Sequence, residues 1–241
     1  MGRREYNNVI GNCLSAERDE NMNNIKAVLF DLDNTILDRV STFKKFVNAF
    51  VNTYFQHIEE KTYIIKRIIY LDQDGYKDKN ELFSELLEEL PWYSKPEMIE
   101  LLNYYKVYYV TNATLMEDAE EIIHYVRQKY KIGLITNGRN VIQYGKIDQL
   151  GIRDDFDLII VSEEAGIKKP NVKIFEKAIE KLELRADECI YIGDHPINDI
   201  EGAGRAGMET IWFEVNQPWR EEVKIQPKYT IKQLSELVRI L

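Results

Sequence analysis

The 241-residue sequence has few of the residues that mark several large protein classes. Its two cysteines, Cys13 and Cys189, are too few for a disulfide framework, so we expect a reducing, cytoplasmic location. No apolar run is long enough to span a membrane and no signal-peptide pattern is present, so we expect no membrane partner. Basic residues are outnumbered, 32 against 41 acidic ones, and the formal charge of -9 argues against binding nucleic acid through bulk charge.

What is present is typical of a globular protein. The composition is 44% hydrophobic and 30% charged, and the length suits one large domain or a domain with an insertion. Residues 1–23 are polar and show no sustained period, so they are predicted to be a flexible N-terminal leader. The folded part is therefore expected to begin near residue 24.

The stretch that follows the leader combines an apolar run with two carboxylates. Ala27–Phe30 is too short for a free-standing helix and fits a strand that is buried on both faces of a parallel sheet. Asp31 and Asp33 come directly after it, and buried carboxylates are costly unless they meet a cation or a proton. A surface turn, in which Asp and Asn side chains satisfy the backbone, is the alternative reading of this stretch alone.

The rest of the chain divides into two patterns. From residue 39 to 112 the apolar residues recur every three and four positions, which predicts an all-helical block whose first helix has Ser41 or Thr42 as its N-cap. Short apolar strands then alternate with helices, which predicts right-handed crossovers and a parallel sheet. The predicted strands are 131–136, 157–162, 188–193 and 209–213. The fold class is therefore α/β: a doubly wound parallel-sheet core, 24–38 and 113–241, with an inserted helical domain, 39–112.

Polar side chains follow each of the predicted strands. In open α/β sheets, ligands bind outside the carboxyl ends of the strands. Carboxylates there can hold a hard cation such as Mg²⁺, which prefers oxygen ligands and often a substrate phosphate, while a Lys and a Thr hydroxyl can hold an anion. The residues at the four strand ends are Asp31, Asp33, Thr136, Asn137, Lys169, Asp194, Asn198 and Asp199.

The order and spacing of these residues resemble the four motifs of the haloacid dehalogenase superfamily over roughly residues 25–215. The resemblance is to the subfamily with a helical cap after the first motif, and to its phosphatase branch, which includes pyrimidine 5′-nucleotidases and sugar-phosphate phosphatases. The matching motifs are Asp31-Leu32-Asp33-Asn34-Thr35, Ile135-Thr136-Asn137-Gly138, Gly166-Ile167-Lys168-Lys169-Pro170 and Gly193-Asp194-His195-Pro196-Ile197-Asn198-Asp199. Residues 39–112 correspond to the cap.

The resemblance implies a Mg²⁺-dependent phosphomonoesterase that acts on a small phosphorylated metabolite, either a nucleoside monophosphate or a sugar phosphate. Asp31 would be the nucleophile that forms an aspartyl-phosphate. Asp33 would protonate the leaving oxygen and then activate water. Thr136 and the Asn137 backbone would hydrogen-bond the transferring phosphoryl group, and Lys169 would neutralise its charge.

The resemblance also implies a set of metal ligands. Mg²⁺ would be held by the Asp31 carboxylate, the Asp33 backbone carbonyl and the Asp194 carboxylate. Asp199, together with Asn198, would orient these ligands from outside. The sequence departs from the family at the return from cap to core, where Glu117-Asp118 stands in place of the Pro-Gly that related chains often carry.

Several alternatives stay open. A phosphotransferase or phosphomutase would share the aspartyl-phosphate and differ in its acceptor, and a non-catalytic binding protein could share the scaffold. A dehalogenase is disfavoured because it needs no acid for its leaving group, whereas Asp33 is present. His195 could contact the substrate or shape its own loop. The sequence does not indicate an oligomeric state.

Overall fold

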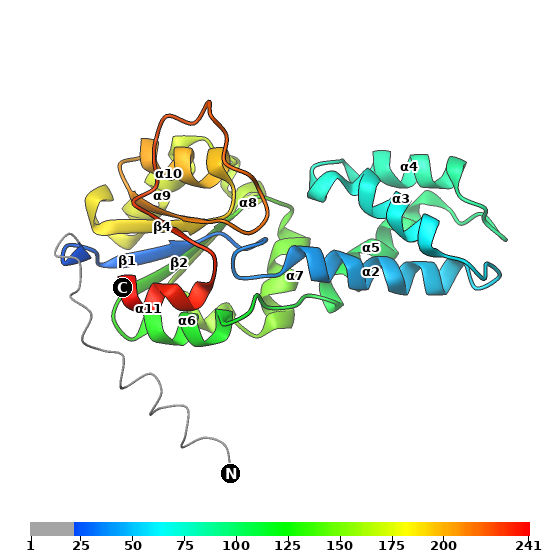
Figure 1. Cartoon of the computed structure of the whole chain (residues 1–241), viewed down its shortest axis with the longest axis horizontal. Coiled ribbons are helices and arrows are strands. Elements are labelled where there is room, and N and C mark those ends of the chain that lie inside the picture. The colour runs from blue at the N-terminus through cyan, green and yellow to red at the C-terminus, as the bar shows by residue number, and fades with distance from the viewer. Residues whose placement is uncertain (1–21) are drawn as a thin grey trace, which may run out of the picture.

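The computed structural model describes residues 22–241, so the predicted leader lies outside the described residues except for its last two. A single sheet of six parallel strands forms the centre of the molecule, in the order β3-β2-β1-β4-β5-β6 (Figure 1). The strands are β1 (Ala27–Phe30), β2 (Lys131–Thr136), β3 (Leu158–Val161), β4 (Cys189–Gly193), β5 (Glu209–Phe213) and β6 (Tyr229–Ile231). The predicted parallel sheet is confirmed. The strand that leads into the first motif, β1, lies between β2 and β4, which lead into the second and fourth motifs.

Helices cover both faces of the sheet. On one face lie α6 (Ala119–Arg127), α7 (Asn140–Leu150) and α11 (Leu237–Ile240), and on the other lie α9 (Val172–Leu182) and α10 (Gly202–Arg205) (Figure 1). Successive β1 residues point to opposite faces, so Val28 and Phe30 pack with the first group of helices while Ala27 and Leu29 pack with the second. Burial on both faces explains why β1 is a continuous apolar run.

The segment between β1 and β2 is helical, as predicted. Its helices are α2 (Arg39–Tyr54), α3 (Thr62–Asp72), α4 (Lys79–Glu89) and α5 (Met98–Thr111), with the short 3₁₀ turn η2 (Gln73–Gly75) after α3. They enclose an aromatic core of their own, separate from the core around the sheet, and stand beyond the carboxyl end of β1 (Figure 1). Phe50 lies at its centre, with its ring centroid 5.9 Å from that of Phe46 and 6.0 Å from that of Trp92. No helix within residues 22–241 is long and apolar enough to cross a membrane.

The first cap helix begins earlier than predicted. Asp38 is its N-cap, because the Asp38 side chain accepts a hydrogen bond from the Ser41 backbone N–H at 2.8 Å. The predicted N-cap, Ser41 or Thr42, was wrong. The Thr42 hydroxyl is instead used in a long-range contact, since it accepts a hydrogen bond from the Thr114 backbone N–H at 3.1 Å. That contact ties the start of the cap to the end of it.

The two segments that connect cap and core run side by side. The Asp38 N–H donates to the Thr114 carbonyl at 2.9 Å, and the Met116 N–H donates to the Ile36 carbonyl at 2.8 Å. Shortly after this pairing, Asp118 adopts a left-handed backbone conformation with φ of 64°. The family resemblance predicts glycine at this position, and an Asp with positive φ has a conformational cost that glycine lacks.

We expect Asp118→Gly to raise the free energy of unfolding by about 0.5–1 kcal/mol, because glycine adopts positive φ without a steric penalty. The measurement is chemical denaturation of both proteins. Glu117→Gly is the matched control and should lower the free energy of unfolding. Glu117 is not among the residues with positive φ, so glycine relieves no strain there and only adds conformational entropy to the unfolded chain. Loss of stability in Asp118→Gly would contradict the strain argument.

Candidate active site

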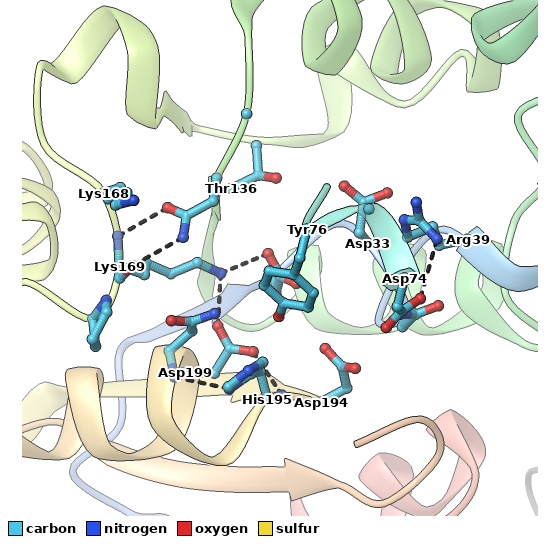
Figure 2. A pocket seen from close by; sticks show the side chains of 17 residues that line it. Asp33, Arg39, Asp74, Tyr76, Thr136, Lys168, Lys169, Asp194, His195 and Asp199 are labelled. Carbon is cyan, nitrogen blue, oxygen red and sulfur yellow. Dashed lines mark hydrogen bonds and ion pairs between the residues drawn. The ribbon is translucent and has the colours of Figure 1, made fainter. Parts of the chain in front are cut away.

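Three neighbouring strands bring their predicted site residues to one edge of the sheet. Thr136 is the last residue of β2, Asp31 directly follows β1, and Asp194 directly follows β4. The order β2-β1-β4 makes these ends adjacent. They line a cavity of about 480 Å³, which also receives Asp33, Asn137, Lys169, Asn198 and Asp199 (Figure 2). All eight residues expected from the sequence therefore lie around one cavity.

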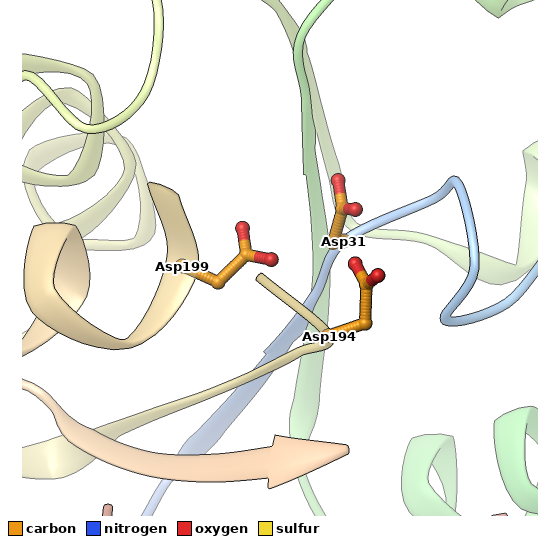
Figure 3. Close-up of side chains that lie close together, drawn as sticks. All are labelled: Asp31, Asp194 and Asp199. Atoms are coloured by element: carbon orange, nitrogen blue, oxygen red, sulfur yellow. The ribbon is translucent and has the colours of Figure 1, made fainter. Parts of the chain in front are cut away.

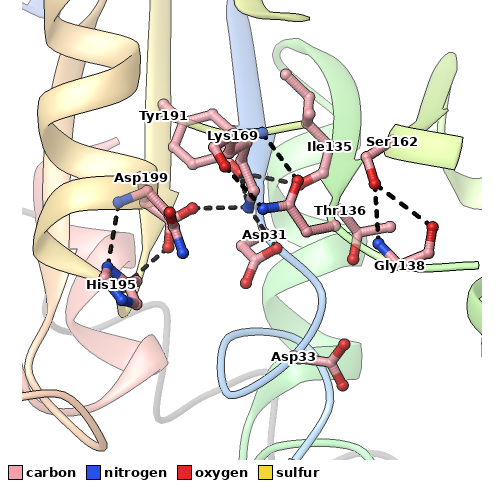
Figure 4. A network of polar contacts seen from close by, with 12 residues as sticks. Asp31, Asp33, Ile135, Thr136, Gly138, Ser162, Lys169, Tyr191, His195 and Asp199 are labelled. Atoms are coloured by element: carbon pink, nitrogen blue, oxygen red, sulfur yellow. Dashed lines mark hydrogen bonds and ion pairs between the residues drawn. The ribbon is translucent and has the colours of Figure 1, made fainter. Parts of the chain in front are cut away.

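Lys169 is the central cation of this cavity. Its side chain is buried, and its Nζ donates to Asp31 Oδ1 at 2.6 Å, to Asp199 Oδ1 at 2.6 Å and to the Tyr191 hydroxyl at 2.9 Å (Figure 4). Burial alone would lower the pKa of Lys169, but the Asp199 and Asp31 carboxylates raise it well above its usual value. The ammonium therefore stays charged. Lys168, its neighbour, is exposed.

Asn137 holds the backbone of Lys169. The Asn137 side chain donates from Nδ2 to the Lys169 carbonyl at 3.0 Å and accepts at Oδ1 from the Lys169 N–H at 2.9 Å. This reciprocal pair links the end of β2 to the loop that carries Lys169. The side chain of Asn137 is thus a positioning group, a role separate from the backbone contact that the resemblance implies.

Asp31, Asp194 and Asp199 form a compact acidic group. Each offers a carboxylate oxygen, and these atoms lie within 4.8 Å of one another (Figure 3). Asp199 accepts hydrogen bonds from Lys169 and from the His195 N–H, the latter at 2.9 Å. The buried Asp194 carboxylate, by contrast, has no hydrogen-bond or ion-pair partner among residues 22–241.

The electrostatics of this group call for a cation. Burial and the negative charges of Asp199 and Asp31 raise the pKa of Asp194 well above its usual value. Burial also raises the pKa of Asp31, to about 7, although the Lys169 ammonium opposes the shift. A second positive charge beside Asp194 would stabilise both ionised carboxylates, and an all-oxygen donor set fits a hard divalent ion such as Mg²⁺.

Asp33 faces two polar residues of α7 that the sequence analysis missed. Lys146 Nζ contacts both carboxylate oxygens of Asp33, at 2.6 and 2.7 Å, and Gln143 Nε2 donates to Oδ2 at 2.9 Å. Gln143 Nε2 also donates to the Thr136 hydroxyl. Burial alone would raise the pKa of Asp33, but Lys146 and Gln143 lower it below its usual value. The helical spacing of Gln143 and Lys146, beside buried Ile147, was the available signal, because it places them on the inward face of α7.

The cap contributes two further residues that were not foreseen. Arg39, at the start of α2, is buried and its guanidinium pairs with Asp72 at 2.5 Å and with Asp74 at 3.1 Å. Tyr76 follows η2, and its ring centroid lies 6.1 Å from that of His195. Both side chains line the cavity, where Figure 2 shows Tyr76 among Lys169, His195 and Asp33, and Arg39 beside Asp33. The cap therefore forms one wall of the site.

A sequence model of haloacid dehalogenase-like hydrolases matches residues 28–213, which is more than half of the chain. The chain belongs to this family. Among its relatives is a glyceraldehyde 3-phosphate phosphatase of Pyrococcus furiosus, 30% identical over 237 residues that cover 91% of this chain and 94% of the relative. A pyrimidine 5′-nucleotidase of Escherichia coli is 37% identical over 130 residues, which cover 53% of this chain and 57% of that enzyme.

Solved structures of related hydrolases have the same architecture. The HAD-hydrolase YfnB of Bacillus subtilis, crystallised with magnesium, superposes with a TM-score of 0.75 at 27% identity, over 90% of this chain and 98% of YfnB. The parallel sheet and the helical insertion of this hydrolase are thus those of its family. A relative that binds magnesium agrees with the cation expected beside Asp194.

His195 in this hydrolase has a structural task. Its Nδ1 accepts hydrogen bonds from the backbone N–H groups of Ile197 and Asn198, each at 3.1 Å, and so caps the π-helical turn η5 (Pro196–Glu201). Burial lowers the pKa of His195, which favours the neutral ring that such an acceptor requires. Of the two readings left open by the sequence, the geometry supports the one in which His195 shapes its loop. That loop in turn places Asn198 and Asp199 at the cavity.

Proposed function

We propose that this hydrolase is a Mg²⁺-dependent phosphomonoesterase that moves the phosphoryl group of a sugar phosphate or nucleoside monophosphate first to Asp31 and then to water. The observation that carries the proposal is the placement of Asp31 between a charged Lys169 and an unpartnered Asp194. A nucleophile flanked by an anion-binding cation and a cation-binding carboxylate suits phosphoryl transfer. The two enzymes named above, both phosphatases of small metabolites, support the same reaction class.

Asp31 is prepared for attack by its contacts. Its Oδ1 accepts from Lys169, whereas Oδ2 has no hydrogen-bond partner among the described residues and is free to form a bond to phosphorus. The P–O bond to the leaving group breaks as the new bond forms, and the leaving oxygen takes a proton from Asp33. In the second step water attacks the aspartyl-phosphate, Asp33 takes its proton, and Asp31 is released with inorganic phosphate. Lys169, Thr136 and the Asn137 N–H hold the phosphoryl oxygens.

The environment of Asp33 suits both of its steps. Without substrate, Lys146 and Gln143 hold Asp33 as a carboxylate, the form that accepts a proton from water. A phosphate dianion that enters the cavity disfavours a second negative charge nearby, so it favours the protonated form of Asp33, which the first step needs. Like-charge repulsion thus couples substrate binding to protonation of the acid.

The metal ligands in this proposal are the Asp31 and Asp194 carboxylates and the Asp33 backbone carbonyl. Mg²⁺ would supply charge that offsets the repulsion between Asp31 and the incoming phosphate. Asp199 is assigned a role outside the ligand set because both of its carboxylate oxygens accept hydrogen bonds, from Lys169 and from the His195 N–H, whereas Asp31 uses one oxygen in this way and Asp194 uses none. Asp199 instead holds the surrounding loop through the His195 N–H, and Asn198 lies in the same loop at the cavity.

We expect Mg²⁺ to raise the melting temperature of the wild-type protein and a chelator to abolish phosphate release, because the cation relieves repulsion within the acidic group. Asp194→Asn should lose most of the Mg²⁺-induced shift, and without metal it should melt at a higher temperature than the wild type. The measurement is thermal unfolding with and without Mg²⁺. Asp154→Asn, at an exposed position, is the control and should keep the full shift. An unchanged shift in Asp194→Asn would remove Asp194 from the ligand set.

The reaction class is tested by phosphate release from p-nitrophenyl phosphate, ribose 5-phosphate and UMP in the presence of Mg²⁺. Hydrolysis of at least one of these esters is expected. Transfer of the phosphoryl group to an added sugar instead of water would assign a phosphotransferase. Absence of turnover on every ester, with Mg²⁺ bound and the fold intact, would overturn the proposal.

A further inference from the structure

A second cavity of about 650 Å³ lies between the cap and the core, beside the catalytic one. The two cavities share part of their lining, including Asp33, Arg39 and Tyr76. Asp33 therefore stands where they join. In the proposed function Asp33 protonates the leaving oxygen, so the leaving group extends from Asp33 into the second cavity.

The second cavity is strongly basic although the chain carries a net charge of -9. Seven cationic side chains and only two carboxylates line it. The cations are Arg39, Lys77, Lys79, Lys106, Arg139, Lys146 and Lys168, and the carboxylates are Asp33 and Asp78. A cavity lined by one sign of charge concentrates ligands of the opposite sign.

Four of the seven cations are neutralised within the protein. The pairs are Arg39 with Asp72 and Asp74, Lys79 with Asp72, Lys77 with Glu85, and Lys146 with Asp33. These cationic side chains are largely buried, so the first three cations belong to the internal framework of the cap and the pair of Lys146 with Asp33 belongs to that of the core. The other three cations of the cavity are not held in such buried pairs.

The remaining cations come from three different segments. Lys106 lies on α5 of the cap, Arg139 directly precedes α7, and Lys168 precedes the phosphate-binding Lys169. Within residues 22–241, Lys106 and Lys168 have no hydrogen-bond or ion-pair partner, and Arg139 reaches Asp78 only at 3.8 Å with its side chain 67% exposed. Three available cations around one cavity are complementary to an anion.

The aromatic residues of the cavity are less suited to a nucleobase. Tyr105 and Tyr109 stack on each other with ring centroids 4.9 Å apart. Lys79 Nζ lies 5.7 Å from the Tyr105 centroid, and Lys146 Nζ lies 5.5 Å from the Tyr109 centroid. These two rings already make stacking and cation–π contacts inside the protein. The third aromatic residue of the cavity, Tyr76, is 62% exposed and has one ring contact among the described residues, with His195. One exposed ring beside several cations makes charge the main recognition that the cavity offers.

We propose that the substrate carries a second anionic group on its leaving part, and that Lys106, Arg139 and Lys168 bind this group in the second cavity. The group is a carboxylate or a second phosphate. The inference rests on the proposed phosphatase activity. It favours phosphorylated sugar acids and sugar bisphosphates as substrates over nucleoside monophosphates.

Matched pairs of esters test the substrate class. Glycerol 3-phosphate and 3-phosphoglycerate differ by a hydroxymethyl group against a carboxylate, and fructose 6-phosphate and fructose 1,6-bisphosphate differ by one phosphate. We expect kcat/KM to be at least about tenfold higher for the anionic member of one pair, and that pair identifies carboxylate or phosphate as the group recognised. Equal values within both pairs, or a higher value for UMP than for every anionic ester, would overturn the inference.

Variants test the three cations. Lys106→Met and Arg139→Met should each lower the ratio of kcat/KM between the anionic and neutral members of the preferred pair by about fivefold to tenfold, and added salt should lower the same ratio. Lys66→Met, an exposed cap residue that lines neither cavity, is the matched control and should keep the wild-type ratio. An unchanged ratio in both test variants would contradict the assignment. Failure to hydrolyse any ester would refute the proposed function itself, whereas hydrolysis without preference would refute only this inference.

Discussion

Asp31→Asn is expected to lower kcat for phosphate-ester hydrolysis by at least about 10⁴-fold, because an amide oxygen does not form the covalent intermediate. The substitution keeps the size of the side chain. It also removes one negative charge from a group that includes Asp194 and Asp199, so the fold should survive. The loss of activity would thus come from chemistry and not from unfolding.

The measurement is the rate of p-nitrophenyl phosphate hydrolysis, together with circular dichroism and thermal unfolding of the variant. Mass spectrometry of the acid-quenched wild type during turnover should locate one phosphoryl group on Asp31, and the variant should show none. The exposed Asp154→Asn is the control and should keep wild-type rates. Near-normal turnover by Asp31→Asn would rule out the aspartyl-phosphate mechanism.

Lys169→Met is expected to lower the free energy of unfolding by about 3–5 kcal/mol, since it leaves two buried carboxylates without their shared cation. The Lys169 Nζ lies 2.6 Å from both Asp31 Oδ1 and Asp199 Oδ1, so both lose a charge-assisted hydrogen bond. The same change should lower kcat by about 10²–10³-fold, as expected when a group that stabilises charge in the transition state is removed.

A second variant separates these two effects. Lys169→Met combined with Asp199→Asn should regain part of the lost stability, because one of the uncompensated charges is gone, yet it should not regain activity. The measurement is chemical denaturation of the single and double variants, with Lys168→Met as the control for stability because Lys168 is exposed. Wild-type stability in Lys169→Met would show that the buried ion pairs contribute little.

The strands and the main site residues were accessible from sequence for local reasons. A strand buried on both faces must be continuously apolar, so β1, β2 and β5 stand out with bounds close to those observed. Asp31 directly follows β1, Thr136 ends β2 and Asp194 directly follows β4. The parallel sheet brings these strand ends together. The hydrophobic periodicity and the order of the strands along the chain were therefore sufficient to predict that these residues lie at one edge of the sheet.

Other residues were missed because their roles depend on partners that are distant in sequence. Lys146 has an ordinary place in a helical pattern, and only the approach of α7 to Asp33, 113 residues earlier, makes it a buried counter-ion. Arg39 and Tyr76 reach the cavity through the placement of the cap over the core. The N-cap of α2 was misassigned for a similar reason, since Thr42 uses its hydroxyl on Thr114.

The amino-acid order alone thus specifies a parallel α/β core, a helical insertion after its first strand, and a motif containing Asp31 and Asp33 that resembles the first motif of the haloacid dehalogenase superfamily. These follow from hydrophobic periods and short motifs, which act within a few residues of one another. Tertiary structure decides the charge state of Asp33, the pairing of Lys169 and the basic second cavity. Burial and the distance between charges set these properties, and both arise only when the cap and the strand ends meet in space.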